Sequence, residues 1–211
     1  MMILRNFVVF EGIDGAGTST QIKMLAERDS ARFVMTAEPT AAETGRFLRR
    51  MLAGEFSVDE RTNAFLFAAD RCEHVYGKGG IMELAESGKT VLSDRYLFSS
   101  LAYQSVSCGD EIPFLVNSVF PLPEILFYFQ IDPEISLGRV NSRNEKKEIY
   151  ETLDAQRKIA GQYERIIAHY EKPEHNCGMR IVRIDAAQSV DEISSQIAGY
   201  FISGSRAEKS E

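Results

Sequence analysis

The sequence lacks three features that would each indicate a particular class of protein. Nothing in it approaches the ~18 consecutive apolar residues that a transmembrane helix needs. Its three cysteines, Cys72, Cys108 and Cys177, are an odd number without metal-ligand spacing, which favours free thiols in a reducing cytosol. Positive charge is also scarce, because 24 Lys and Arg residues face 31 Asp and Glu residues and leave a net charge of −7. This balance argues against a general binder of nucleic acid or anionic membranes.

The N-terminal segment also lacks the small-residue cleavage site of a signal peptide and runs directly into a strand-like segment. We therefore expect a cytoplasmic protein with no nucleic-acid and no membrane partner. A small anionic substrate remains compatible with the acidic composition, because a local basic pocket can lie in an acidic protein.

The composition itself is that of an ordinary globular domain. The chain has 211 residues, of which 44% are hydrophobic and 26% are charged. A chain of this length can bury a sizeable core and accommodate at most a small mobile insert. We expect a single domain over residues 1–203 with a short lid around residues 139–151, followed by a polar, disordered tail at residues 204–211.

Short apolar segments rich in β-branched residues alternate with longer segments of helical periodicity. Strands are expected at residues 7–10, 32–36, 90–93, 125–131 and 180–184. Helices are expected at about 18–28, 43–53, 59–87, 98–107, 134–143, 150–171 and 189–202. Strands separated in this way pair in parallel through right-handed crossovers, so we predict an α/β three-layer sandwich with a five-stranded parallel sheet. Ligands of such sheets bind beyond the carboxyl ends of the strands.

A glycine-rich turn follows the first expected strand. Residues 12–20 read Gly-Ile-Asp-Gly-Ala-Gly-Thr-Ser-Thr and lead into the first expected helix. In such a turn the backbone N–H groups point at phosphate oxygens, and the helix N-terminus adds partial positive charge. Ser19 lies where a P-loop hydroxyl binds Mg²⁺, but Thr18 replaces the lysine that normally accompanies the transferred phosphate. Taken alone, the turn could also be an ordinary strand–helix connection.

Further segments add to this turn. The turn lies within residues 9–21 (VFEGIDGAGTSTQ), and three other segments accompany it: 66–71 (LFAADR), 93–104 (SDRYLFSSLAYQ) and 184–189 (IDAAQS). Together, and in this order, they resemble the thymidylate kinase family over nearly the whole chain. The resemblance implies a P-loop NTPase fold with strand order 2-3-1-4-5, transfer of the ATP γ-phosphate to dTMP with Mg²⁺, and a homodimer. The ATP-binding residues that it implies are Gly12, Asp14, Gly15, Ala16, Gly17, Thr18, Ser19 and Thr20.

The resemblance also implies roles around the acceptor nucleotide. Asp94 follows the third expected strand and is expected to hold Mg²⁺ together with Ser19. Arg95 is expected to clasp the acceptor phosphate, and Asp14 to accept a hydrogen bond from the sugar 3′-OH; both are counted as catalytic. The remaining acceptor-binding residues are Pro39 in the acceptor loop, Phe67 against thymine, Arg71 toward its O4, and Ser100, Tyr103 and Gln104 around the base and deoxyribose. Two of these have a simpler alternative, since Phe67 could be a core residue and Pro39 a turn former.

Three cations that the family pattern places at the phosphates are missing. Thr18 replaces the P-loop lysine, and Ala37 stands in Ala-Glu-Pro where Arg-Glu-Pro is common. In a loose alignment, Ile149 occupies the arginine position of a lid motif of the form Asp-Arg-x-Glu at residues 148–151. The loss of one such group typically costs about 10²–10³ in rate, so three uncompensated losses would leave almost no activity.

Other basic residues are placed to compensate. Arg143 is the expected partner of the transferred phosphoryl group, Arg139 is expected to support it, and Lys146 and Lys147 follow in the lid. On the helix after the acceptor loop, Arg46 and Arg50 share a face, so we expect one of them to cover for Ala37. For each of these the alternative is a solvated surface charge.

Two further functions compete with a thymidylate kinase. One is a nucleotide-binding homologue with impaired catalysis, which would keep the nucleoside pocket and lose phosphate contacts. The other is a deoxynucleoside kinase, in which Glu38 could act as the base near a sugar hydroxyl.

Overall fold

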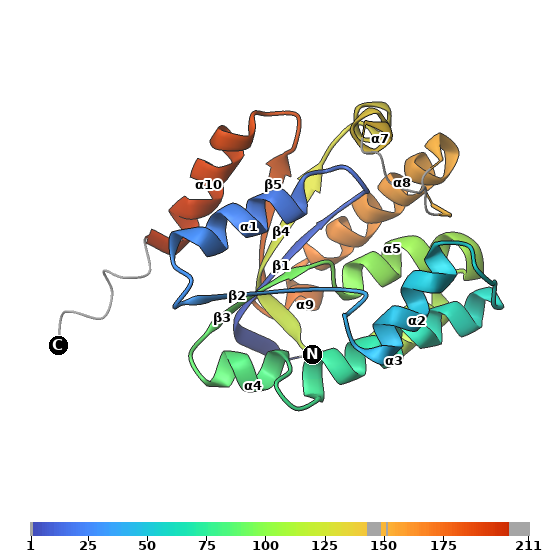
Figure 1. Ribbon diagram of the computed structural model, residues 1–211, viewed down its shortest axis with the longest axis horizontal. Coiled ribbons are helices and arrows are strands. Elements are labelled where there is room, and N and C mark those ends of the chain that lie inside the picture. Colours follow the sequence, from blue (N-terminus) through green and yellow to red (C-terminus); the bar gives the residue numbers. More distant parts are fainter. Residues whose placement is uncertain (1, 143–148, 151, 203–211) are drawn as a thin grey trace.

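The computed structural model describes residues 2–142, 149–150 and 152–202 and contains one parallel sheet. Its strands lie in the order β2-β3-β1-β4-β5, and every neighbouring pair is parallel (Figure 1). The predicted α/β class and strand order are therefore confirmed. The strands are β1 (Ile3–Gly12), β2 (Phe33–Ala37), β3 (Thr90–Asp94), β4 (Leu122–Gln130) and β5 (Arg180–Asp185).

Helices connect these strands and cover both faces of the sheet (Figure 1). They are α1 (Thr18–Arg28), α2 (Glu43–Leu52), α3 (Glu60–Tyr76), α4 (Ile81–Glu86), α5 (Leu97–Cys108), α6 (Glu111–Asn117), α7 (Pro133–Asn141), α8 (Leu153–Tyr170), α9 (Pro173–Asn176) and α10 (Val190–Ile202). None of the helices in the described residues has the length and apolar character needed to cross a membrane.

Alternate residues of the central strand face two separate hydrophobic cores. Val8 and Phe10 of β1 lie in the core that α1 and α10 cover, whereas Phe7 and Val9 lie in the core beneath α4, α5 and α8. All four side chains are buried. A strand that buries both faces reads as a continuous apolar run, which is why the segment at residues 7–10 was recognisable in the sequence.

Side-chain caps explain where several helices begin. The carboxylate of Asp59 accepts a hydrogen bond from the backbone N–H of Arg61 at 3.0 Å and so begins α3. Asp132 accepts one from the N–H of Glu134 at 2.8 Å, and Pro133 occupies the first turn of α7. Both arrangements satisfy N–H groups that have no partner inside the helix.

Two expectations about the helices were wrong. The single helix expected at residues 59–87 is divided into α3 and α4, because the glycine-containing segment 77–80 turns the chain between them. Gly79 in this segment has a φ of 72°, a left-handed conformation that glycine adopts readily. The helices α6 and α9 were not expected at all. The remaining expected helices are present with ends shifted by at most three residues, and α1 has the expected bounds.

The carboxyl ends of the central strands converge at one edge of the sheet. Phe10 of β1 and Ala37 of β2 both lie level with Asp94 at the end of β3, and Gly12 lies level with Phe129 of β4. The glycine-rich turn, the acceptor loop after β2 and the Asp94-Arg95 segment therefore lie next to one another at this edge.

Candidate active site

The turn between β1 and α1 has the backbone of a phosphate-binding loop. Gly15 and Gly17 have φ values of 86° and 96°, in the left-handed region that favours glycine. A Cβ atom on Gly15 would lie 2.5 Å from the carbonyl oxygen of Ser136, so α7 packs directly against the turn. Thr18 begins α1, and the N-terminus of this helix points its free N–H groups toward the cavity described below.

A hydroxyl and a carboxylate meet beside this turn. The Oγ of Ser19 in α1 donates a hydrogen bond to Oδ2 of Asp94 at the end of β3. Magnesium is commonly held by one or two protein oxygens together with substrate phosphates and water, so this pair fits a Mg²⁺–nucleotide complex. Elsewhere in the described residues, no three His, Cys, Asp or Glu side chains gather as a metal site.

Arg95 lies at the centre of the polar network and has an unusual backbone conformation. Its φ is 69°, which is uncommon for a residue with a Cβ atom. Its guanidinium bonds the carboxylate of Asp14 at 2.5 Å, and donates to the carbonyl of Gly12 and the hydroxyl of Ser99, both at 3.2 Å. Burial opposes the charge, but Tyr103 and Asp14 raise the pKa of Arg95 well above its usual value. The guanidinium is thus a fixed positive charge next to the phosphate-binding loop.

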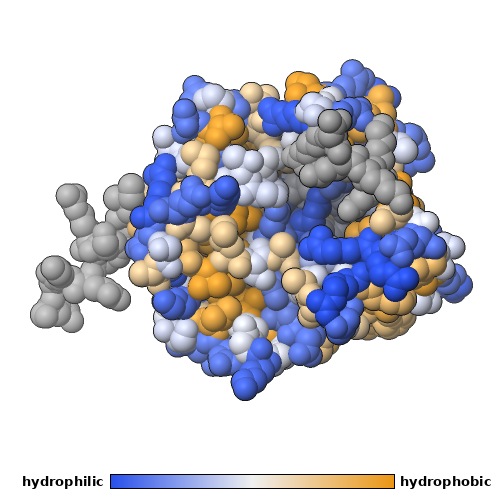
Figure 2. All heavy atoms as spheres, viewed as in Figure 1, coloured by the Kyte–Doolittle hydropathy of each residue, from blue (hydrophilic) through white to orange (hydrophobic). Residues whose placement is uncertain are grey.

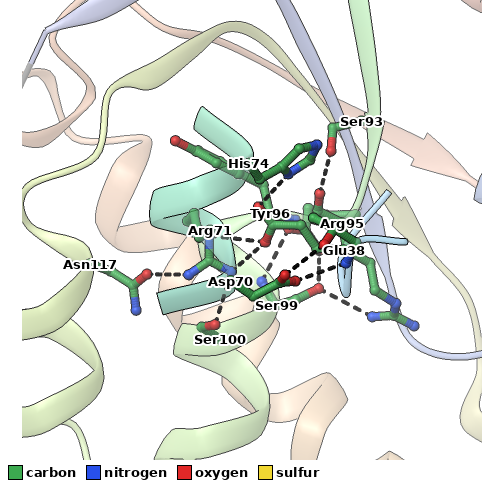
Figure 3. Close-up of polar contacts among 12 residues, drawn as sticks. Glu38, Asp70, Arg71, His74, Ser93, Arg95, Tyr96, Ser99, Ser100 and Asn117 are labelled. Carbon is green, nitrogen blue, oxygen red and sulfur yellow. Dashed lines mark hydrogen bonds and ion pairs between the residues drawn. The ribbon is translucent and has the colours of Figure 1, made fainter. Parts of the chain in front are cut away.

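Arg71 of α3 is buried among polar partners, and its guanidinium lies over the rings of Tyr96 and Phe120. It is 1% exposed, and its Nε and Nη2 atoms both donate to Oε2 of Glu38, at 3.0 and 2.6 Å (Figure 3). Its remaining donors reach Oδ1 of Asn117 and, at 3.0 Å, Oγ of Ser100. The second oxygen of Glu38 bonds Nδ1 of His74 at 3.0 Å. Both oxygens of Glu38 are therefore occupied, and the Arg71 guanidinium is held in one orientation.

Tyr103 and Gln156 complete the surroundings of Asp14. The hydroxyl of Tyr103 donates to Oδ2 of Asp14 at 3.1 Å, and the amide of Gln156 in α8 donates to the same oxygen at 2.8 Å. Gln104, one turn along α5 from Ser100, is 1% exposed, and within the described residues its Oε1 atom has no hydrogen-bond partner. A buried amide oxygen of this kind is ready to accept from a ligand N–H group.

These residues line one cavity of about 320 Å³. Figure 2 shows this face of the molecule, where hydrophilic residues border a hollow. Of the residues named from the sequence, the cavity is lined by Asp14, Gly15, Gly17, Thr18, Ser19, Thr20, Ala37, Glu38, Pro39, Phe67, Arg71, Asp94, Arg95, Ser100, Tyr103 and Gln104. Gly12 and Ala16 lie in the same turn, where Gly12 accepts from Arg95 and Ala16 is buried in the core. The residues that the sequence scattered over ninety positions are thus brought together.

The basic residues of α2 are arranged differently from the expectation. Arg46 pairs with Glu43 and Arg50 pairs with Glu55; both arginines are exposed, and neither is among the residues that line the cavity beside Ala37. Arg49 lies between them in sequence and lines the cavity instead, donating to the carbonyl oxygen of Pro39. Arg49 could not be selected from the sequence, because the orientation of α2 relative to the cavity depends on packing.

The lid residues divide into two groups. Arg139 of α7 donates to the carbonyl of Ala186 after β5 at 3.1 Å and is not among the residues that line the cavity, so its catalytic role stays a prediction. Arg143, Lys146, Lys147 and Glu148 lie outside the described residues, as does Glu151. Ile149 is 50% exposed, whereas Tyr150 lines the cavity with its ring centroid 5.3 Å from that of Tyr103. Tyr150 had not been identified from the sequence as a cavity residue.

A parallel sheet of this order, with a phosphate-binding turn after its central strand and a Ser19–Asp94 pair beside it, has the P-loop NTPase α/β fold. Comparison with known proteins narrows this class. The thymidylate kinase family model matches residues 10–197, and the chain belongs to that family.

Three similar proteins each match more than nine tenths of the chain. A putative thymidylate kinase of Treponema pallidum is 41% identical over 200 residues, which cover 93% of this chain and 95% of that protein. A thymidylate kinase of Leptospira borgpetersenii is 38% identical, covering 93% of each chain. A probable thymidylate kinase of Methanocaldococcus jannaschii is 37% identical, covering 94% of this chain and 97% of that protein.

Proposed function

We propose that this protein is a thymidylate kinase, which transfers the γ-phosphate of ATP to dTMP and yields ADP and dTDP. One observation carries the proposal: one cavity is lined both by the phosphate-binding turn and by the polar side chains of Arg71, Ser100 and Gln104. Arg95 and Asp14, which bond each other, line the same cavity. Membership of the thymidylate kinase family supports the choice of dTMP as acceptor.

The reaction needs positioning and charge more than proton transfer. A phosphate oxygen of dTMP attacks the γ-phosphorus of ATP, and the bond from that phosphorus to the β–γ bridging oxygen breaks as ADP leaves. The attacking oxygen is already anionic, so no general base is required. Mg²⁺, when bound with the nucleotide at Ser19 and Asp94, neutralises charge on the phosphates. In our proposal Arg95 holds the acceptor phosphate and Asp14 accepts from the sugar 3′-OH.

The wall formed by Arg71, Ser100 and Gln104 suits thymine. Arg71 offers a fixed positive donor to a ring carbonyl, and the unpaired Oε1 of Gln104 offers an acceptor for a ring N–H group. Phe67 lines the same part of the cavity and supplies an apolar face for the base. In our proposal Tyr103, whose hydroxyl donates to Asp14, lies beside the sugar and crowds a ribose 2′-OH, so that deoxyribose is favoured.

The missing cations have named candidates in this proposal. Arg49 takes the place of the arginine absent at Ala37, because it lines the cavity beside Pro39. Arg143 is proposed for the transferred phosphoryl group and Arg139 for its support, as the sequence suggested. A lid that closes over the site would bring such residues to the phosphates and exclude water.

The two competing functions are less well supported. A deoxynucleoside kinase would use Glu38 as a base, but both oxygens of Glu38 are engaged by Arg71 and His74 in a buried cluster. A homologue with impaired catalysis is distinguished from an enzyme by experiment. A cytoplasmic location and a homodimer belong to the proposal as well, with three unpaired cysteines consistent with a reducing compartment.

The test is ADP production from ATP and Mg²⁺ with dTMP, alongside thymidine, dUMP and no acceptor. Turnover with dTMP above about 1 s⁻¹, within the range of kinases, is the expected result. Turnover with thymidine in place of dTMP would identify a deoxynucleoside kinase. Micromolar binding of dTMP without ADP production would leave a nucleotide-binding homologue.

A further inference from the structure

Glu11 is a buried carboxyl group that the roles above do not use. It is the next-to-last residue of β1, directly before Gly12, and is 0% exposed. Four hydrogen bonds end on its oxygens. Oε1 accepts from the backbone N–H groups of Tyr96 and Ser99 at 2.8 and 3.1 Å, and Oε2 accepts from the hydroxyls of Ser99 and Tyr163 at 2.6 and 2.8 Å. Because each of these contacts is a donor, the surroundings suit the ionised carboxylate.

The donors belong mainly to the segment that carries Arg95. Tyr96 follows Arg95 directly, and Ser99 lies in the first turn of α5 (Figure 3). Tyr96 occupies the N-cap position of α5 but caps no helix N–H with its own side chain. Glu11 supplies that cap from a different strand, so it fixes the start of α5 against the end of β1. The same bonds hold Arg95 in its left-handed backbone conformation.

Ser99 connects Glu11 to the guanidinium itself. Its hydroxyl donates to Glu11 and accepts from Nη1 of Arg95 at 3.2 Å. The carboxylate thus orients the hydroxyl so that its lone pairs face the arginine. Asp14 holds the other terminal nitrogen of Arg95, so the guanidinium is fixed from two sides.

We propose that Glu11 is a positioning residue, whose ionised form holds the turn at residues 95–99 so that Arg95 can bind the acceptor phosphate. The inference rests on the proposed role of Arg95 in the thymidylate kinase reaction. A proton on Glu11 removes one accepting site, so either one of the four hydrogen bonds breaks, or the hydroxyl of Ser99 or of Tyr163, which lie 2.8 Å apart, turns to accept that proton. The position of Arg95 then changes with the charge of Glu11.

Burial raises the pKa of Glu11 from 4.5 to about 7, against the opposing effect of the hydrogen bond from Ser99 and the charge of Arg95. The ionisable groups facing it do not titrate in this range. Arg95 stays charged, and burial raises the pKa values of the neighbouring tyrosines above their usual value of 10. These tyrosines are Tyr96 after β3, Tyr128 of β4 and Tyr163 of α8. Among these groups, Glu11 is the one whose charge changes near neutral pH.

The first experiment compares dTMP with thymidine as ligands of the wild type and of Glu11→Gln, by calorimetry without ATP at pH 8. Glutamine has the same shape but only one accepting atom, so it cannot accept all four hydrogen bonds. We expect the Kd of dTMP to rise about ten-fold or more, since hydrogen bonds to charged groups have this strength. The Kd of thymidine, which has no phosphate for Arg95, is expected to change less than two-fold.

The second experiment repeats the binding measurement between pH 6 and pH 8.5. The ratio of the two dTMP dissociation constants, variant over wild type, is expected to rise from near one at low pH to its full value above pH 8, with a midpoint near 7. The second ionisation of a phosphate, near pH 6, affects both proteins alike and cancels in the ratio. A purely structural role for Glu11 would not produce this profile.

Several results would overturn the proposal. Equal weakening of dTMP and thymidine would show a general structural effect, and unchanged dTMP binding would show that Glu11 does not act on Arg95. If the wild type binds dTMP and thymidine with equal Kd values, Arg95 does not bind the acceptor phosphate and the proposal is wrong. If Glu11→Gln does not unfold cooperatively, Ser99→Ala tests the same connection, because it removes the hydroxyl between Glu11 and Arg95 and leaves the bonds to Tyr96 and Tyr163. These experiments measure binding and not turnover. A failure of the proposed kinase activity would appear in the ADP assay and is therefore distinguishable from a failure of this proposal.

Discussion

The pair formed by Arg71 and Glu38 is the most deeply buried pair of charges in the acceptor wall, with side chains 1% and 3% exposed. Two charges at this depth stabilise each other only when both are present and their remaining hydrogen bonds are satisfied. Ser100, Asn117 and His74 satisfy them here. At the scale of single residues, therefore, the base-binding wall is also part of the folded core, and substitutions in it change stability and binding together.

A double-mutant cycle tests this coupling. Arg71→Met leaves Glu38 buried without its partner and is expected to lower the free energy of unfolding by about 3–5 kcal/mol. The double variant Glu38→Gln/Arg71→Met should lose clearly less than the sum of the two single variants, because it removes both charges. Urea unfolding measures all three. Arg61→Met, which removes an exposed pair with Asp59, is the control and should change stability little. Additive losses in the cycle would contradict the coupling.

Restoring a lysine at position 18 tests the phosphate site. Thr18 begins α1 and lines the cavity, so a lysine there can reach nucleotide phosphates without rebuilding the backbone. We expect Thr18→Lys to raise kcat/KM for ATP by about ten-fold, less than the 10²–10³ of an uncompensated cation, because other arginines already supply charge. Steady-state kinetics measure the change. Thr18→Met adds similar length without charge and should not improve kcat/KM; equal gains in both variants would exclude an electrostatic cause.

At the scale of elements, the acceptor loop is fixed by the helices on either side of it. Asp70 of α3 accepts from the N–H and the hydroxyl of Thr40, at 2.8 and 2.6 Å, and from the hydroxyl of Thr44 at 2.6 Å. On the other side, α2 approaches so closely that a Cβ atom on Gly45 would lie 2.0 Å from the carbonyl oxygen of Thr40. The loop that carries Glu38 and Pro39 thus has no freedom to shift without moving α2.

Gly45→Ala is therefore expected to displace this loop. The added methyl group meets backbone atoms of Thr40, which cannot rotate away, so we expect destabilisation of about 1–3 kcal/mol and a higher KM for dTMP. Gly161→Ala in α8 is the matched control, because no atom lies within 4 Å of the new Cβ. A helical alanine in place of glycine should stabilise by about 0.5–1 kcal/mol and leave KM unchanged. Thermal unfolding and steady-state kinetics distinguish the two; a stabilising Gly45→Ala would contradict the packing argument.

The sequence predicts where these helices lie but not which face of each helix meets the cavity. Periodicity predicted α2 and placed Arg46 and Arg50 on one face, yet Arg49 lines the cavity. Periodicity fixes which residues share a face but not which face meets the site. The helix expected at residues 59–87 failed for a related reason, because its apolar pattern continues through the turn at residues 77–80 that separates α3 from α4.

For the molecule as a whole, the sheet and the phosphate-binding turn could be predicted because their signals are local. Each strand is a short apolar segment, and the turn is a run of neighbouring glycines followed by a helix. The buried network could not be predicted, since Glu11 meets Tyr163 across 152 positions and Glu38 meets Arg71 across 33. Family resemblance supplied roles for Asp14, Arg95 and Arg71, but it gave none for Glu11, whose hydrogen-bond donors come from the start of α5 and from α8.

Glu11 also shapes the dependence of overall stability on pH. Its pKa is about 7 in the folded protein and 4.5 as the ordinary value, so the folded state binds more protons between these limits. Stability therefore falls as pH rises from about 4.5 to 7, by about 3 kcal/mol from this group alone. Acidic groups with lowered pKa values, such as Asp110 and Glu164 beside arginines, act oppositely and lose their contribution only below their ordinary pKa.

The expected consequence is a difference in slope between the wild type and Glu11→Gln. Urea unfolding at pH 5, 6, 7 and 8 should show wild-type stability decreasing relative to the variant by up to about 3 kcal/mol across this range, since glutamine carries no titratable proton. Glu164→Gln is the control: the pKa of Glu164 is lowered, so this variant should lose a constant amount of stability from pH 5 to pH 8 and its curve should run parallel to that of the wild type in this range. Parallel curves for the wild type and Glu11→Gln would mean that Glu11 has the same pKa in both states. A steeper wild-type curve would mean that the ionised carboxylate of Glu11 destabilises the fold at neutral pH. The protein would then carry this cost at the position where, in our proposal, the same charge holds Arg95 in place.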